Sequence, residues 1–149
     1  YIIMIEPILV SSSLLIGKEM FSQTINTTTK NIYNGIDKIL LNDNLQFKDF
    51  LEDLDITIKL DIINTFILDI HSNNKIFNNS VSKTFKYLEE ILKIIELEIE
   101  NINNELIKHN EKWFSKFRSS NSSYMLQKLV KHIKILDDRF ELLMKLIKI

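Results

Sequence analysis

The chain of 149 residues contains no cysteine and no alanine, and it has only one proline and two glycines. Without cysteine it forms neither a disulfide nor a thiolate metal site. Its two glycines, Gly17 and Gly35, are too far apart for a glycine-rich phosphate-binding loop. Without alanine, its helices must be built from Leu, Lys, Glu, Met and Ile, so they depend on packing more than on intrinsic propensity.

The abundant residues are isoleucine, asparagine and lysine, whose codons are AT-rich, and we infer an AT-rich genome. Apolar residues make up 45% of the chain. This fraction is typical of a folded protein, and the length suits one domain with a real core. We therefore expect a single domain over residues 1–149.

Large apolar residues recur at alternating four- and three-residue steps through the second half of the chain. This spacing keeps one face of a helix apolar for as long as it lasts. The first run is Val81, Phe85, Leu88, Leu92, Ile95, Ile99, Ile102, Leu106, His109 and Trp113, and the second is Leu126, Leu129, Ile133, Leu136, Phe140, Leu143 and Ile147.

The break at 119–123 is short and polar, so we predict an antiparallel coiled-coil hairpin of helices 80–118 and 124–149, opened by Ser80 or Ser82. The second helix is shorter and covers only about two thirds of the first. The remainder, around 81–92, then needs cover from the N-terminal helices or from another molecule.

The first half also shows helical spacing. We expect one helix or a helix pair over 7–41, with 27–29, three threonines, as the weak point. Short helices should follow over 47–71, with Asp55 capping the second of them. The alternation over 56–62 also fits a strand, but the helical spacing continues beyond it. The predicted fold class is an all-α helical bundle.

Residues 2–16 form an apolar segment of about fifteen residues, where a membrane span needs about twenty. No basic flank precedes it, so we expect no signal peptide, and an intracellular or virion location is favoured. Contact with a membrane through 2–16 stays open as an alternative.

Chemical signatures are weak throughout. The three histidines match no metal-binding pattern, and Glu105 and His109 have the i, i+4 spacing where a di-iron bundle needs i, i+3. Adjacent acids such as Glu89 and Glu90 point about a hundred degrees apart on a helix. We therefore predict a protein that is not an enzyme, with no catalytic, cofactor-binding or metal-binding residues and no cofactor.

Charge is unevenly distributed along the chain. From residue 107 onward there are ten basic residues against four acidic ones, giving +6, while residues 1–106 carry −7. Such a molecule is suited to self-association or to an acidic partner. Basic-patch candidates are Lys108, Lys112, Lys116, Arg118, Lys128, Lys131 and Lys134, although on the last helix these lysines and His132 are more typical of a solvated face.

Aromatic residues are interleaved with this basic cluster. We weigh three roles for them: packing at the hairpin, a protein-binding hot spot, and stacking on nucleic acid. The candidates for protein contact are Trp113, Phe114 and Phe117, together with the start of the seam at Val81, Phe85 and Leu88.

Three stretches, 4–10, 23–33 and 136–140, together with the AT-rich composition, resemble small all-helical proteins of large DNA viruses of the giant-virus kind. The resemblance implies a virion or other viral structural role and brings no functional residues with it. We hypothesise a non-enzymatic structural or assembly protein that acts through helix-mediated contacts with itself or another protein. The alternatives are a nucleic-acid-binding module using the basic hairpin 108–134 and a peripheral membrane protein anchored by 2–16.

Overall fold

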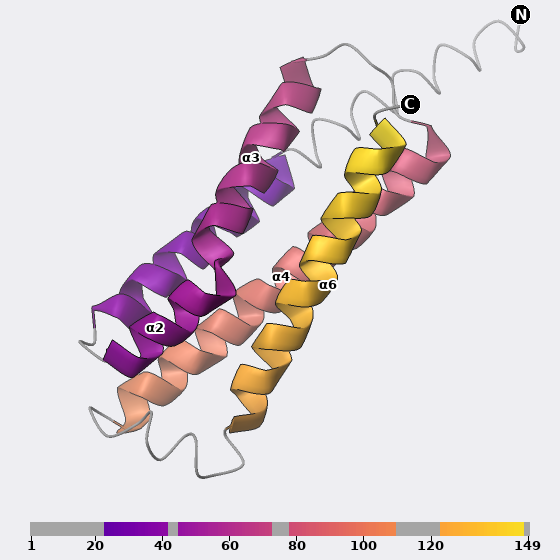
Figure 1. Cartoon of the computed structure of the whole chain (residues 1–149). Coiled ribbons are helices and arrows are strands. Elements are labelled where there is room, and N and C mark those ends of the chain that lie inside the picture. Colours follow the sequence, from indigo (N-terminus) through magenta and orange to yellow (C-terminus); the bar gives the residue numbers. More distant parts are fainter. Residues whose placement is uncertain (1–22, 42–44, 73–77, 110–122, 148–149) are drawn as a thin grey trace, which may run out of the picture.

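The computed structural model describes residues 23–41, 45–72, 78–109 and 123–147. Every regular element in these ranges is an α-helix, which confirms the predicted all-α class (Figure 1). A helix over residues 23–40 is followed by the elements α2 (Leu45–Leu54), α3 (Ile56–Ser72), α4 (Asn79–His109) and α6 (Ser123–Ile147). Residues 56–62 begin α3, so the strand alternative for this stretch is wrong.

The helix over 23–40 runs unbroken through the three threonines, which were expected to be its weak point. Packing explains the continuity. Thr29 is fully buried, and its hydroxyl donates to the Asn26 backbone oxygen at 3.0 Å and lies 2.9 Å from Asn64 Oδ1 of α3. The β-branched residue that costs helix propensity thus contributes a contact to the neighbouring helix.

Asp55 separates α2 from α3. Its φ of 56° is in the left-handed region, which Asp tolerates better than most residues. The Asp55 amide donates to the Glu52 oxygen at 3.0 Å, and its carbonyl accepts from the Lys59 amide at 3.1 Å. One helix therefore ends and the next begins at this residue, as the sequence predicted.

Asn78 caps the first turn of α4. Its Oδ1 accepts from the Val81 amide at 2.8 Å, and its backbone oxygen accepts from the Ser82 amide at 3.0 Å. These are the bonds of an N-cap residue. The expected caps, Ser80 and Ser82, instead lie inside the helix, which begins at Asn79.

α4 and α6 form the predicted antiparallel hairpin. Two contacts set the register: His132 pairs with Glu98, and Arg139 reaches Tyr87. Along the hairpin the residues of the predicted seam are buried as one core: Val81, Phe85, Leu88, Leu92, Ile95, Ile99, Ile102, Leu106, Leu126, Leu129, Ile133, Leu136, Phe140 and Leu143.

The described hairpin has nearly equal arms. α4 has 31 residues and α6 has 25, or about 46 Å and about 37 Å. Continuing the register brings Val81 to the level of Ile147, which packs against the core. The stretch 81–92, predicted to need cover from the N-terminal helices or from another molecule, is buried within the described chain at Val81, Phe85, Leu88 and Leu92.

The helices of the first half pack against this hairpin in one core. The helix over 23–40 contacts α3 through Tyr33 Oη, which donates to the Thr57 oxygen at 3.2 Å, and it approaches α4 at Gly35. α3 meets α6 where Phe66 and Phe140 pack edge to face, with ring centroids 5.3 Å apart. In Figure 1, α3 and α6 both run upward, whereas α4 runs downward from the upper right to the lower left.

A candidate interaction face on the helical hairpin

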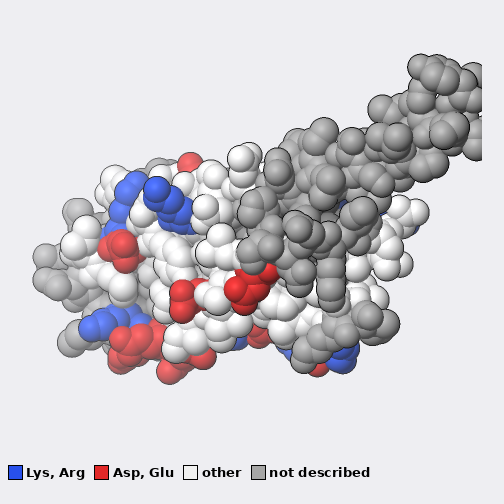
Figure 2. All heavy atoms as spheres, turned by 90° about the horizontal axis from the view of Figure 1, so that it is seen from above, with Lys and Arg blue, Asp and Glu red and all other residues white. Residues whose placement is uncertain are grey.

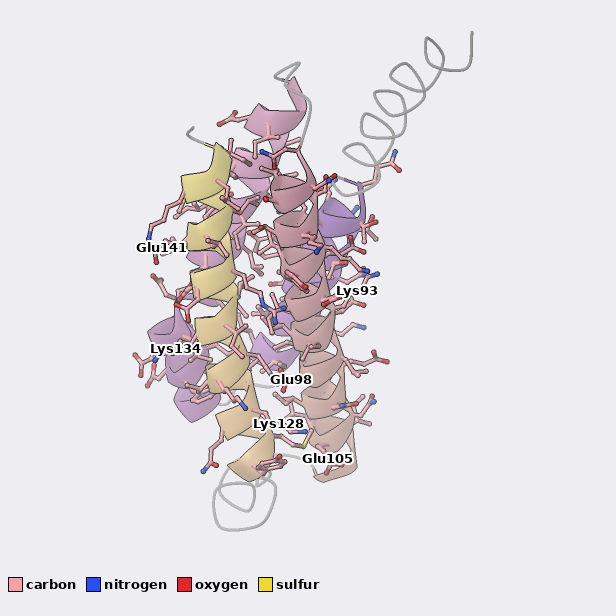
Figure 3. All side chains as sticks on the ribbon, turned by 90° about the vertical axis from the view of Figure 1, so that its right-hand side faces the viewer. Lys93, Glu98, Glu105, Lys128, Lys134 and Glu141 are labelled. Atoms are coloured by element: carbon pink, nitrogen blue, oxygen red, sulfur yellow. The ribbon has the colours of Figure 1, made fainter. Side chains whose placement is uncertain are left out.

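A half-buried ionisable pair lies at the seam between α4 and α6. His132 Nδ1 is 2.8 Å from both carboxylate oxygens of Glu98, and the two side chains are 19% and 13% exposed. Burial raises the pKa of Glu98 above its ordinary value, and the hydrogen bond and charge of His132 and the charge of Lys128 lower it by less. Figure 3 shows Glu98 and Lys128 coming from the two helices toward the same part of the seam.

Arg139 reaches across the seam nearer the N-terminal end of α4. Its Nη1 donates to the Tyr87 backbone oxygen at 2.7 Å, and its guanidinium lies 5.7 Å from the centre of the Tyr87 ring. This distance is within the range of a cation–π contact. Tyr87 is therefore fixed at the edge of α4 that adjoins α6.

Apolar side chains continue outward from these seam contacts. On α4, Tyr87, Ile94 and Leu97 are 49%, 41% and 56% exposed. On α6, Leu142 is 51% exposed, and Ile135, seven residues before it, is half-buried. Residues seven apart share a helix face. We call these five residues, Tyr87, Ile94, Leu97, Ile135 and Leu142, the hairpin face.

Opposite charges predominate on the two helices that bear this face. α4 carries six acidic and four basic residues, whereas α6 carries five basic and three acidic ones. The acidic and basic halves of the sequence therefore lie side by side over these helices, and the excess charges are not separated at opposite ends. Seen from above in Figure 2, charged groups form small separate clusters with uncharged surface between them.

The aromatic and basic candidates from the sequence have mixed positions. Trp113, Phe114, Phe117, Lys112, Lys116 and Arg118 lie outside the described residues. Lys108 belongs to the last turn of α4. Lys128 lies 4.9 Å from the centre of the Tyr124 ring, and Lys131 and Lys134 are exposed.

The seam candidates Val81, Phe85 and Leu88 are all buried, so they belong to the core and offer no free surface. His132, expected on a solvated face, is instead turned toward Glu98. Sequence reasoning did not identify the hairpin face. Its seven-residue spacing is present on both helices, but it lies beside the stronger seam, and only the register brings the two sets of residues together.

The described residues also bear on metal binding and on membrane insertion. Within the described ranges, no three His, Asp or Glu side chains gather where they could hold a metal ion. No helix in the described part of the chain is long and apolar enough to cross a membrane. The segment 2–16, the candidate for membrane contact, lies outside these ranges.

Comparison with known proteins returns no relative. No protein-family model matches the chain, and no curated protein or solved structure matches it either.

Proposed function

We propose that this chain is a non-enzymatic structural or assembly protein that acts through helix-mediated contacts with other protein. The observation that carries the proposal is the hairpin face. Four of its five side chains are at least two fifths exposed, and they lie along the two helices of the hairpin. Exposed apolar side chains that lie on one face and are flanked by polar groups are typical of a protein-binding site.

The surroundings of the ionisable groups also support a role without chemistry. Glu98 and His132 pair with each other, and Lys59 pairs with Asp137 at 2.8 Å. Each pair links two helices, so a structural role accounts for these side chains. A general acid or base needs, in contrast, a proton to transfer in a substrate pocket.

The resemblance to helical proteins of large DNA viruses makes a virion component the specific form of this proposal. A nucleic-acid-binding role has less support. Of its described basic residues, Lys128 lies over Tyr124 and within the electrostatic influence of Glu98, which leaves it less available to neutralise a phosphate.

The proposal is tested with the full-length chain in two measurements. Sedimentation velocity from micromolar to near-millimolar concentration reports self-association. A photo-crosslinking amino acid at position 97, on the hairpin face, reports contacts in the cell that makes the protein, and one at position 65, on α3, serves as the control.

We expect concentration-dependent association, or protein crosslinks at position 97 in excess of those at position 65. A strict monomer with no protein crosslinked at position 97 would overturn the proposal.

A further inference from the structure

We propose that Asn34 is a modification site that loses its side-chain amide when the helix over 23–40 opens, becoming aspartate or isoaspartate. The isoaspartate form then weakens the packing of this helix on α4. Asn34 is followed by Gly35, and this is the only Asn-Gly pair in the sequence. The modification does not depend on the proposed function, because it requires the backbone at Gly35 and no partner.

The reaction needs no enzyme, and water is its only co-reactant. The backbone nitrogen of Gly35 attacks Cγ of Asn34, the new C–N bond closes a succinimide ring, and ammonia leaves while the amide proton passes to solvent. Water then opens the ring. Breaking the bond from nitrogen to Cγ gives aspartate, and breaking the bond from nitrogen to the main-chain carbonyl carbon gives isoaspartate. Glycine favours the attack because it has no Cβ to hinder its nitrogen.

The folded helix protects Asn34 from this reaction, although its side chain is exposed. Inside an α-helix each amide donates to the carbonyl four residues before it, and the backbone is held at helical dihedral angles. The Gly35 nitrogen is therefore kept out of line with Cγ of Asn34. Asn103 of α4 also holds this turn, because its Nδ2 donates to the Gly35 oxygen at 2.9 Å. The reaction thus proceeds from the open state, and its rate reports how often the helix opens.

The position of Gly35 against α4 makes the helix sensitive to isoaspartate. Isoaspartate carries the chain through its Cβ, so it inserts an extra carbon atom into the backbone directly before Gly35. A Cβ placed on Gly35 would lie 2.5 Å from Ile99 Cγ2, so there is no free space toward α4 at this point. The added length must shift Gly35 or break helical hydrogen bonds, whereas aspartate keeps the normal backbone and leaves the contact in place.

The first test compares the full-length chain when folded and in urea above its unfolding transition, at the same slightly alkaline pH. Peptide mapping by mass spectrometry measures modification at position 34. We expect a reaction at least about tenfold faster in urea, where every chain is open. Gly35→Ala should slow the reaction in urea at least about tenfold, because the added Cβ hinders the nitrogen. Equal rates in the folded and unfolded chain, or no effect of Gly35→Ala in urea, would overturn the proposal.

The second test concerns the contact with α4. Asn103→Ala removes the donor to the Gly35 oxygen, so the folded chain should react about threefold to tenfold faster while the rate in urea stays the same. Asn104→Ala, at the exposed neighbouring position, is the matched control and should leave both rates within about twofold. An unchanged rate in folded Asn103→Ala would show that opening does not depend on α4, and this part of the proposal would be wrong.

The third test concerns the product. The chain is modified in urea and refolded, its isoaspartate form is separated by chromatography, and peptide mapping selects the fraction that is modified at position 34 alone. We expect this form to unfold at a lower urea concentration than the Asn34→Asp variant, which has the same composition and charge but the normal backbone. A modified chain that does not refold also supports the proposal, whereas equal unfolding midpoints would overturn the effect of isoaspartate on packing.

Discussion

α4 packs against two neighbours in different ways. At Gly35, on the helix over 23–40, the contact is close and uncharged: a Cβ placed on Gly35 would lie 2.5 Å from Ile99 Cγ2, and Asn103 Nδ2 donates to the Gly35 oxygen at 2.9 Å. At α6 the seam includes the Glu98–His132 pair. The first contact depends on side-chain volume, whereas the second also depends on protonation.

The two contacts of α4 therefore stabilise the fold in different ways, one by dense packing and one through an ionisable pair. Close backbone approach permits dense packing, and dense packing tolerates little added volume. A half-buried ion pair contributes little net stability but couples the fold to pH. The predictions below test whether the two contacts of α4 respond separately to these changes.

The largest loss of stability is expected from a substitution in the hydrophobic core that α4 shares with the other helices. Phe85 is 1% exposed, so Phe85→Ala leaves a cavity and should lower the free energy of unfolding by about 3–5 kcal/mol. Urea unfolding followed by circular dichroism measures this loss. Lys86→Ala, at the exposed neighbouring position, should change stability by no more than about 0.5 kcal/mol. If the two substitutions lowered the free energy of unfolding equally, the core position of Phe85 would be contradicted.

Gly35→Ala should disturb only the contact with the helix over 23–40. The added methyl group meets Cγ2 of Ile99, which is attached next to the backbone and cannot swing away. Overpacking costs about 1–3 kcal/mol, and alanine regains about 1 kcal/mol of helix propensity, so we expect a net loss of roughly 1 kcal/mol.

The matched control is Asn34→Ala, next to Gly35 and exposed, which should instead stabilise the helix by a few tenths of a kcal/mol. A more stable Gly35→Ala protein would show that the two helices are not in close contact at this point. Urea unfolding at neutral pH measures both variants.

Glu98→Gln should reveal the pH dependence of the α6 contact. Burial raises the folded-state pKa of Glu98, so its contribution to stability is present below the unfolded-state pKa and is lost as pH rises through the folded-state pKa. We expect the wild type to lose stability relative to Glu98→Gln as pH rises above the ordinary pKa of Glu, by under about 1 kcal/mol because the pair remains partly exposed.

Replacing His132 sharpens this test. His132→Asn removes the charge that lowers the pKa of Glu98, so the loss of stability with rising pH should grow. Gly35→Ala should leave the pH dependence unchanged. Parallel pH profiles for the wild type and Glu98→Gln would contradict the coupling.

The sequence predicted the parts of the fold that depend on periodicity. Every seam position from Leu126 to Leu143 is buried, and the helical interpretation of 56–62 is confirmed. The cap at Asn78 was missed because two serines nearby are equally good capping residues. Gly35 gave no signal, since a glycine inside a helix reveals a close approach only when its neighbour is known.

The pairing of Glu98 with His132 and the hairpin face were missed for another reason. Partners 34 residues apart depend on the register of two helices, and the seam alone does not fix that register. The stretch 81–92 was predicted to need cover, and its seam residues are buried within the described chain. The identity of a partner is not encoded in helical spacing, so it remained a hypothesis.

Lys59→Met should have the smallest effect, although it also breaks a contact between helices. Lys59 Nζ is 2.8 Å from Asp137 Oδ2, linking α3 to α6, but both side chains stay partly exposed. Solvent screens such a pair, and Met keeps most of the apolar stem, so we expect a loss of no more than about 0.5 kcal/mol that shrinks as salt is added. A double-mutant cycle with Asp137→Asn in urea isolates the pairwise energy. A coupling above about 1 kcal/mol would contradict the expected screening of this pair by solvent.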